Sequence, residues 1–126
     1  MPIKTLGRHL VAEFYQCDHR IISDVRKIEE IMVGAAKHAK ATIVDVVFHN
    51  FNPNGISGVI VIQESHLAIH TWPEYNFASV DIFTCGSSVK PWRAYDYLHK
   101  HFKAKNVTSM EMQRGLVGST KKRPSR

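Results

Sequence analysis

Polar residues that can carry chemistry gather in one stretch, residues 63–75, with the sequence QESHLAIHTWPEY. They follow an apolar segment, so Ser65 is expected at a turn that begins a new strand. Alternate side chains of a strand share a face of the sheet. One face of this strand then carries His66, Ala68, His70 and Trp72. The opposite face carries Leu67, Ile69 and Thr71. Two imidazoles and an indole therefore share a surface next to a serine.

The following strand, expected at residues 77–85, adds an acid and a thiol. Alternation places on one of its faces Phe77, Ser79, Asp81, Phe83 and Cys85. If the two strands pair as a hairpin, Cys85 lies toward the same end as Ser65. The sequence thus predicts that strand adjacency gathers a serine, a histidine, a cysteine and an acid.

Several kinds of site fit these residues when they are considered alone. The histidines can be hydrogen-bonded groups at a polar strand end with no chemical role. Ser65, His70 and Asp81 can form a hydrolase triad, although the chain lacks a G-x-S-x-G turn that would expose a nucleophilic serine. Cys85 can act as a nucleophile with His70 as its base.

A metal site is not expected. On a strand, His66 and His70 lie two pleats apart, ~13 Å along its axis. That separation is too large for two ligands of one ion. His99 and His101 are also available, but no second paired spacing supports them.

The composition indicates one globular domain. The chain has 126 residues, 44% of them hydrophobic, and a formal net charge of +6. Four of those charges lie in the last eight residues, so the body predicts no nucleic-acid groove. We expect a single domain over residues 1–118 and a basic flexible tail over residues 119–126.

The sequence predicts a cytoplasmic location. It has no apolar run near the ~18 residues of a membrane span and no apolar signal core at its start. Its two cysteines, Cys17 and Cys85, are too few for a disulfide scaffold and are expected to be reduced thiols.

The first half of the chain predicts a strand, a helix and a hairpin. Residues 8–15 alternate weakly and favour a strand. Asp18 is expected to cap a helix whose buried stripe is Val25, Ile28, Met32, Ala35, Ala36 and Ala39. Residues 42–48 are β-branched and almost wholly apolar, which predicts a strand covered on both faces. Residues 52–55 form a turn before a strand at 56–62.

The second half predicts strands at residues 66–72 and 77–85, a helix, and a last strand at 107–112. Ser88 is expected to cap the helix, with Pro91 in its first turn. The buried face of that helix is expected to carry Trp92, Tyr95, Leu98 and Phe102. The order β-α-β-β-β-β-α-β predicts a two-layer α+β sandwich, an antiparallel sheet with two helices on one face. A partner subunit is expected to cover the other face, forming a dimer.

Five motifs closely resemble those of prokaryotic S-adenosylmethionine decarboxylases, a family of self-processing enzymes. The resemblance extends from about residue 7 to residue 115, and the motifs have the family's order and spacing. The motifs are GRHLVAE at 7–13, FHNF at 48–51, GISGV at 55–59, ESHLAIHTWPE at 64–74 and DIFTCG at 81–86.

The resemblance implies that the chain cuts itself between Glu64 and Ser65, into residues 1–64 and 65–126. The Ser65 hydroxyl would attack the Glu64 carbonyl to form an ester, assisted by Ser57. His70 matches the family's base for the elimination that follows. The new terminus at position 65 would become a pyruvoyl group, with loss of ammonia.

The resemblance also implies how the substrate is handled. A pyruvoyl ketone would form a Schiff base with S-adenosyl-L-methionine and accept the electrons released with CO2, replacing pyridoxal phosphate. Cys85 matches the proton donor, Phe51 and Trp72 the residues that stack on adenine, and Glu74 the acceptor for the ribose hydroxyls. The product is S-adenosylmethioninamine, the aminopropyl donor for spermidine biosynthesis. No metal, nucleic acid or membrane is implied, and the partner is a second copy of the cleaved chain.

Two alternatives remain open from the sequence. Relatives with the same fold and pyruvoyl chemistry act on arginine or ornithine, although Phe51 and Trp72 favour a nucleoside. An inactive regulatory paralogue is the other alternative, against which Ser65, His70 and Cys85 argue.

Overall fold

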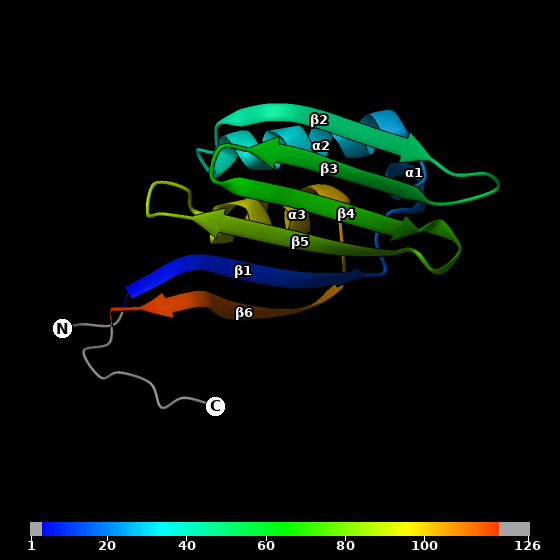
Figure 1. Ribbon diagram of the computed structural model, residues 1–126. Coiled ribbons are helices and arrows are strands. Elements are labelled where there is room, and N and C mark those ends of the chain that lie inside the picture. Colours follow the sequence, from blue (N-terminus) through cyan, green and yellow to red (C-terminus); the bar gives the residue numbers. More distant parts are fainter. Residues whose placement is uncertain (1–3, 119–126) are drawn as a thin grey trace, which may run out of the picture.

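A computed structural model, which describes residues 4–118, forms two layers (Figure 1). One layer is a six-stranded antiparallel sheet with the strand order β2-β3-β4-β5-β1-β6. The helices cover one face of this sheet, as expected. The strands are β1 (Lys4–Tyr15), β2 (Ile43–Asn50), β3 (Ile56–Ile62), β4 (Ser65–Trp72), β5 (Phe77–Cys85) and β6 (Asn106–Val117). The helices are α1 (His19–Ile22), α2 (Val25–His38), the 3₁₀ turn η1 (Pro73–Tyr75) and α3 (Pro91–Phe102).

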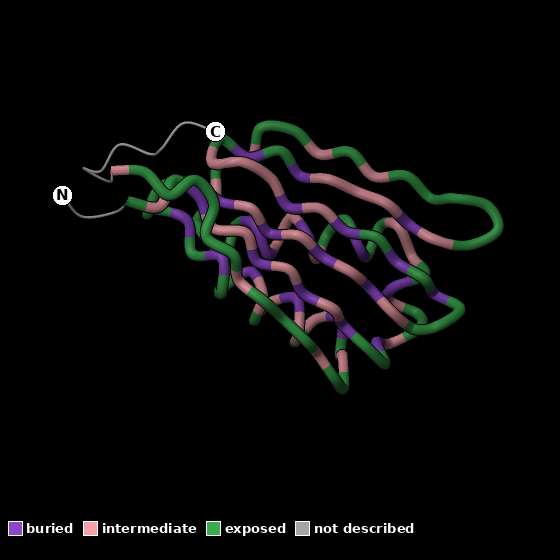
Figure 2. Tube along the Cα trace, turned by 60° about the horizontal axis from the view of Figure 1, so that its bottom comes forward, coloured by how far each residue is buried: buried purple, intermediate pink, exposed green. Residues whose placement is uncertain are grey.

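The core lies between the sheet and the helices (Figure 2). β5 alternates between buried and half-buried residues along most of its length, so one face packs on the helices and the other stays open. The helices meet that core with the periodic stripe expected of them, including Ile28 and Met32 from α2 and Leu98 and Phe102 from α3. In the part of the chain that the structure describes, no layer covers the second face of the sheet. No described helix is long and apolar enough to cross a membrane.

The first helix was expected to start at Asp18, but two helices stand there. The Asp18 side chain accepts a hydrogen bond from the Arg20 N–H and caps the single turn of α1. The Asp24 side chain accepts from the N–H groups of Arg26 and Lys27 and caps α2. Two good capping residues six positions apart thus divide the segment.

The expectation that residues 42–48 are covered on both faces is wrong. β2 is an edge strand, and most of its residues are half-buried or exposed. A register shift between Ile43 and Asp45 also interrupts its alternation. The apolar composition correctly predicted a strand, but it carries no information on whether that strand lies at the edge or in the centre of the sheet.

The second helix differs in its cap and in one buried residue. Its N-cap position is Lys90 rather than Ser88, and the Lys90 N–H donates to the Ala39 carbonyl oxygen (2.9 Å), which fixes the start at Pro91. Trp92 is 39% exposed rather than buried, because its indole N–H donates to Glu111 Oε1 at 2.7 Å.

The last strand is longer than expected at both ends. The expected tail, residues 119–126, lies outside the described residues.

The packing of α3 on the sheet predicts that Leu98→Ala lowers the free energy of unfolding by about 2–5 kcal/mol, because Leu98 is fully buried. The same substitution at Leu6, which is half exposed, is the matched control and should cost less than about 1 kcal/mol. Urea unfolding at one protein concentration measures both. Equal losses in the two variants would contradict the placement of α3.

Candidate active site

The peptide bond between Glu64 and Ser65 lies where β3 turns into β4. Ser65 has a backbone φ of 141°. Residues with a Cβ rarely adopt this conformation, which costs of order 1–3 kcal/mol. Pairing on both sides imposes it, because Ser65 lies opposite Ile62 of β3 and Thr84 of β5. Backbone strain therefore coincides with the bond that is expected to be cut.

The carbonyl of this peptide bond is held from the neighbouring strand. The Cys85 backbone N–H donates to the Glu64 carbonyl oxygen at 2.7 Å. The Glu64 carboxylate accepts from the Thr42 N–H at 3.1 Å and from Thr42 Oγ1 at 3.2 Å. A carbonyl fixed by an N–H donor is polarised toward attack, because the same donor stabilises an oxyanion that forms there.

Ser65 has an imidazole beside it, but it is not the one expected. The Ser65 hydroxyl lies 3.4 Å from His66 Nδ1. The His66 ring meets the Phe83 ring edge-on, with centroids 5.7 Å apart. The sequence prediction assigned no role to His66, although His66 directly follows Ser65 in the chain and this adjacency is a signal that the sequence contains.

The other end of β4 holds a second cluster. Ser57 Oγ lies 2.8 Å from His70 Nδ1. Both line a pocket of about 260 Å³, together with the three residues expected to bind substrate, Phe51, Trp72 and Glu74. Phe51 and Trp72 are 49% and 40% exposed, so their rings are accessible from solvent in a single chain.

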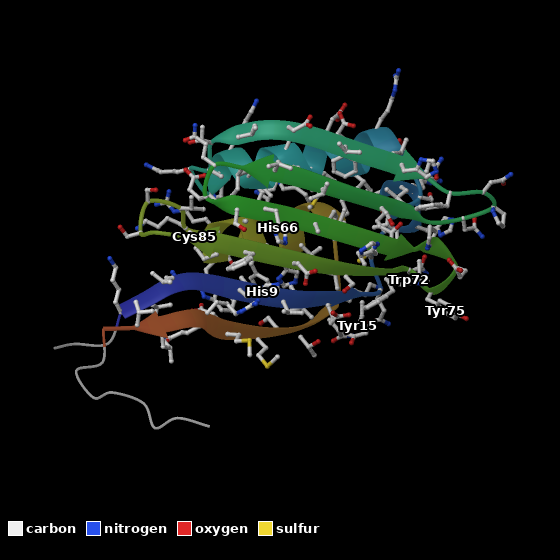
Figure 3. All side chains as sticks on the ribbon, viewed as in Figure 1. His9, Tyr15, His66, Trp72, Tyr75 and Cys85 are labelled. Atoms are coloured by element: carbon white, nitrogen blue, oxygen red, sulfur yellow. The ribbon has the colours of Figure 1, made fainter. Side chains whose placement is uncertain are left out.

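The expected gathering of a serine, a histidine, a cysteine and an acid is met only in part within a single chain, because the histidine beside Ser65 is His66 rather than His70. Cys85 lies at the Ser65 end, as expected, but His70 lies five residues along β4, about 16 Å from Ser65. Figure 3 shows Cys85 toward one end of the sheet and Trp72 toward the other. Asp81 lies opposite Ala68, and its carboxylate approaches His9 Nε2 at 3.6 Å, so no triad with Ser65 and His70 forms.

A cluster in the middle of the open face was not predicted. The His9 ring stacks on Phe83 with centroids 5.2 Å apart, and the Arg114 guanidinium lies 5.1 Å from the Phe83 ring centroid. Arg114 also reaches His9 Nδ1 at 3.0 Å. Alternation along the first strand could have placed His9 on this face, but its neighbours depend on β1 lying between β5 and β6.

The two cysteines differ in environment. Cys17 is buried, and loss of solvation raises the pKa of its thiol to about 12. Its thiol donates to the Phe14 carbonyl oxygen at 3.4 Å. Cys85 is exposed on the open side, next to Ser65. Cys85 is thus the thiol available for chemistry.

Other hollows lie away from these residues. One of about 680 Å³ is lined by the loop after β1, η1 and the end of α3, and it contains none of the expected site residues. Within residues 4–118, no three His, Cys, Asp or Glu side chains are grouped as metal ligands.

Comparisons with known proteins give similar chains of one family. A family model described as S-adenosylmethionine decarboxylase matches residues 8–115. Two relatives, each called S-adenosylmethionine decarboxylase proenzyme, come from Pelotomaculum thermopropionicum and Thermotoga maritima. The first is 55% identical over 118 residues, which is 94% of each chain. The second is 56% identical over 113 residues, 90% of this chain and 87% of the relative.

A solved structure, the adenosylmethionine decarboxylase from Aquifex aeolicus, has the same fold. It superposes with a TM-score of 0.87 at 38% identity, and the match covers 95% of this chain and 99% of that one.

The cysteine environments predict that iodoacetamide at pH 8 modifies Cys85 and spares Cys17 in the folded protein. With a pKa of about 12, only about one Cys17 thiol in ten thousand is ionised at that pH. Peptide mass spectrometry should find one modified site in the native state and two in urea. Cys85→Ser should take up no label while folded, and equal labelling of both native cysteines would contradict the burial of Cys17.

Proposed function

Because the chain belongs to the S-adenosylmethionine decarboxylase family, we propose that Ser65 is the precursor of its electron-accepting group. The chain is a decarboxylase that converts S-adenosyl-L-methionine to S-adenosylmethioninamine and CO2, for spermidine biosynthesis. The observation that carries the proposal is the Glu64–Ser65 peptide, with its strained φ of 141° and its carbonyl held at 2.7 Å by the Cys85 N–H.

Decarboxylation of an α-amino acid needs an electron sink, which no ordinary side chain supplies. A pyruvoyl group at position 65 would supply a ketone conjugated to an amide for this purpose. The residues around position 65 suit such a group. The Cys85 N–H already donates to the Glu64 carbonyl oxygen there, and position 65 is only half-buried, so a substrate amine can approach it.

The precursor reaction starts on the chain itself. The Ser65 hydroxyl attacks the Glu64 carbonyl carbon, and the Cys85 N–H stabilises the oxyanion. Departure of the Ser65 nitrogen then converts the amide to an ester. His70 removes the Ser65 Cα proton, and elimination releases residues 1–64 with a free Glu64 carboxylate. The dehydroalanine left at position 65 tautomerises and is hydrolysed with loss of ammonia.

Other residues act on the substrate. The aromatic rings of Phe51 and Trp72 stack on the adenine and attract the sulfonium by cation–π interaction, worth about 0.5–2 kcal/mol. The Glu74 carboxylate accepts hydrogen bonds from the ribose hydroxyls. Their common pocket with Ser57 and His70 supports these roles. The Cys85 thiol, next to position 65, returns a proton to the substrate carbon after CO2 leaves.

These roles require two copies of the chain. The Ser65–Cys85 cluster and the Ser57–His70 pocket lie at opposite ends of β4 on one chain, about 16 Å apart. If two open faces pack about a twofold axis that is parallel to the sheets and perpendicular to the strands, opposite strand ends meet. His70 of one copy then reaches Ser65 of the other, and two complete sites form.

The open face has the composition of such an interface. It exposes large apolar side chains from strands across the sheet, namely Val47, Val61, Trp72, Met110, Met112 and Leu116. Exposed apolar patches of this kind mark association sites. We therefore infer a homodimer in which each active site takes residues from both chains.

The proposed precursor role predicts that Ser65→Ala remains a single 126-residue chain without decarboxylase activity, because the attacking hydroxyl is gone. Intact mass under denaturing conditions and CO2 release measure the two effects. Ser79→Ala is the control, since Ser79 lies on β5, which pairs with β4, but its hydroxyl donates to Glu13 at 3.0 Å, and this variant should still be cut. A Ser65→Ala chain that splits at residue 65 would remove Ser65 as the nucleophile.

The two-copy site predicts complementation between two inactive variants. A differently tagged Ser65→Ala chain and His70→Ala chain should each stay uncut when expressed alone. In the mixed dimer, the first chain supplies His70 to Ser65 of the second, so the His70→Ala chain should be cut. Mass analysis of each tagged chain measures this. Absence of cutting in purified mixed dimers would place the whole site within one chain.

A further inference from the structure

We propose that His66 is the base that moves the Ser65 hydroxyl proton in the first step of processing, a role distinct from that of His70. The inference rests on the proposed cutting at Ser65 and assigns one proton transfer in that reaction.

The position of the imidazole is the first observation. His66 Nδ1 lies 3.4 Å from the Ser65 hydroxyl oxygen, the only side-chain hydrogen bond of that hydroxyl among the described residues. Contacts of catalytic bases are often long before the reaction and shorten in the transition state. His66 is therefore placed to touch a reacting atom.

Within one chain, neither the Glu64 carboxylate nor the His70 imidazole is placed to take the Ser65 hydroxyl proton. The Glu64 carboxylate is engaged by the Thr42 N–H and hydroxyl. Within one chain His70 lies about 16 Å along the strand. The His70 of a second copy, which reaches position 65 in the proposed dimer, is bonded to Ser57 at 2.8 Å and takes the Cα proton in the later step. The Ser65 hydroxyl must nevertheless lose its proton, because a neutral alcohol is a weak nucleophile.

The surroundings of His66 fix the ring. Its edge packs on Phe83, with the two ring planes at 89°, and Phe83 is held from its other side by the His9 ring and the Arg114 guanidinium. Figure 3 shows His66 on β4, Cys85 on the adjacent strand β5 and His9 on β1, which lies beyond β5. The central cluster of the open face thus keeps the imidazole beside Ser65.

The step balances with a single proton. The Ser65 Oγ–H bond breaks and its proton goes to His66 Nδ1, while Oγ bonds to the Glu64 carbonyl carbon. The electron pair of the C=O bond moves to the oxygen, which the Cys85 N–H stabilises. When the pair returns, the bond from carbon to the Ser65 nitrogen breaks, and that nitrogen takes the proton back from His66. The products are an ester, a free amine and an unchanged imidazole.

The experiment follows chains made by cell-free synthesis, so that uncut precursor can be observed as it forms. We expect His66→Ala to be cut about 100-fold or more slowly than wild type, the usual contribution of a general base. Because the first step is blocked, little ester should accumulate, and hydroxylamine should cleave little precursor. His70→Ala, blocked after the ester, should be cleaved by hydroxylamine.

Two further variants separate catalysis from packing. His101→Ala is the matched control, because it removes an imidazole that stacks on Tyr97 in the helix layer, and it should be cut at close to the wild-type rate. His66→Gln retains a polar group but cannot shuttle the proton and should be as slow as His66→Ala. Added imidazole should accelerate cutting of His66→Ala and leave His101→Ala unchanged, which loss of packing would not produce.

Cutting of both His66 variants within about threefold of the wild-type rate would overturn the proposal. Accumulation of a hydroxylamine-sensitive ester in them would also overturn it, since His66 would then act later. If His66→Ala does not fold, the cutting rate of His66→Gln tests the proposal in its place. A wild-type chain that is never cut would instead refute the proposed processing itself.

Discussion

The antiparallel pairing of β4 with β5 is the constraint on which the site depends. It brings the Cys85 N–H to the Glu64 carbonyl oxygen at 2.7 Å, and it fixes Ser65 at a φ of 141°. One backbone hydrogen bond therefore orients the carbonyl that is attacked, and the same residue brings a thiol beside position 65. Because a hydrogen bond from the sheet does this, the geometry exists before any substrate binds. Such preorganisation is what makes attack on a stable peptide bond feasible.

The open face of the sheet connects the fold to the function. Two helices and one short turn of helix suffice to bury one face, and the described chain leaves the other uncovered. The two functional clusters lie at opposite ends of β4, and His9, Phe83 and Arg114 lie on the open face toward the end that carries His66 and Cys85. A second copy in the proposed orientation covers the apolar side chains and completes both sites together. On this account, dimerisation is a requirement of the chemistry as well as of stability.

Much of the arrangement could be predicted from the sequence, because β4 and β5 alternate strictly. Buried Leu67 and Ile69 set the face of β4, and hairpin pairing placed Cys85 beside Ser65. The same strand geometry also implies that His70 lies far from Ser65, but the sequence prediction of the site did not take this distance into account. The strand order was not readable, so neither the edge position of β2 nor the cluster around His9 was found. The N-cap positions, Asp24 for α2 and Lys90 for α3, depend on which of several nearby residues forms the capping contact. Residue preferences for capping do not decide between such neighbours.

The intact mass of freshly purified wild-type protein under denaturing conditions tests the central claim most directly. The account predicts two chains, residues 1–64 ending in a normal carboxylate and a 62-residue chain from position 65. The second chain should lack a free amino terminus and gain two mass units on borohydride reduction of its ketone. A single unbroken chain of 126 residues, unchanged by borohydride, would contradict the account.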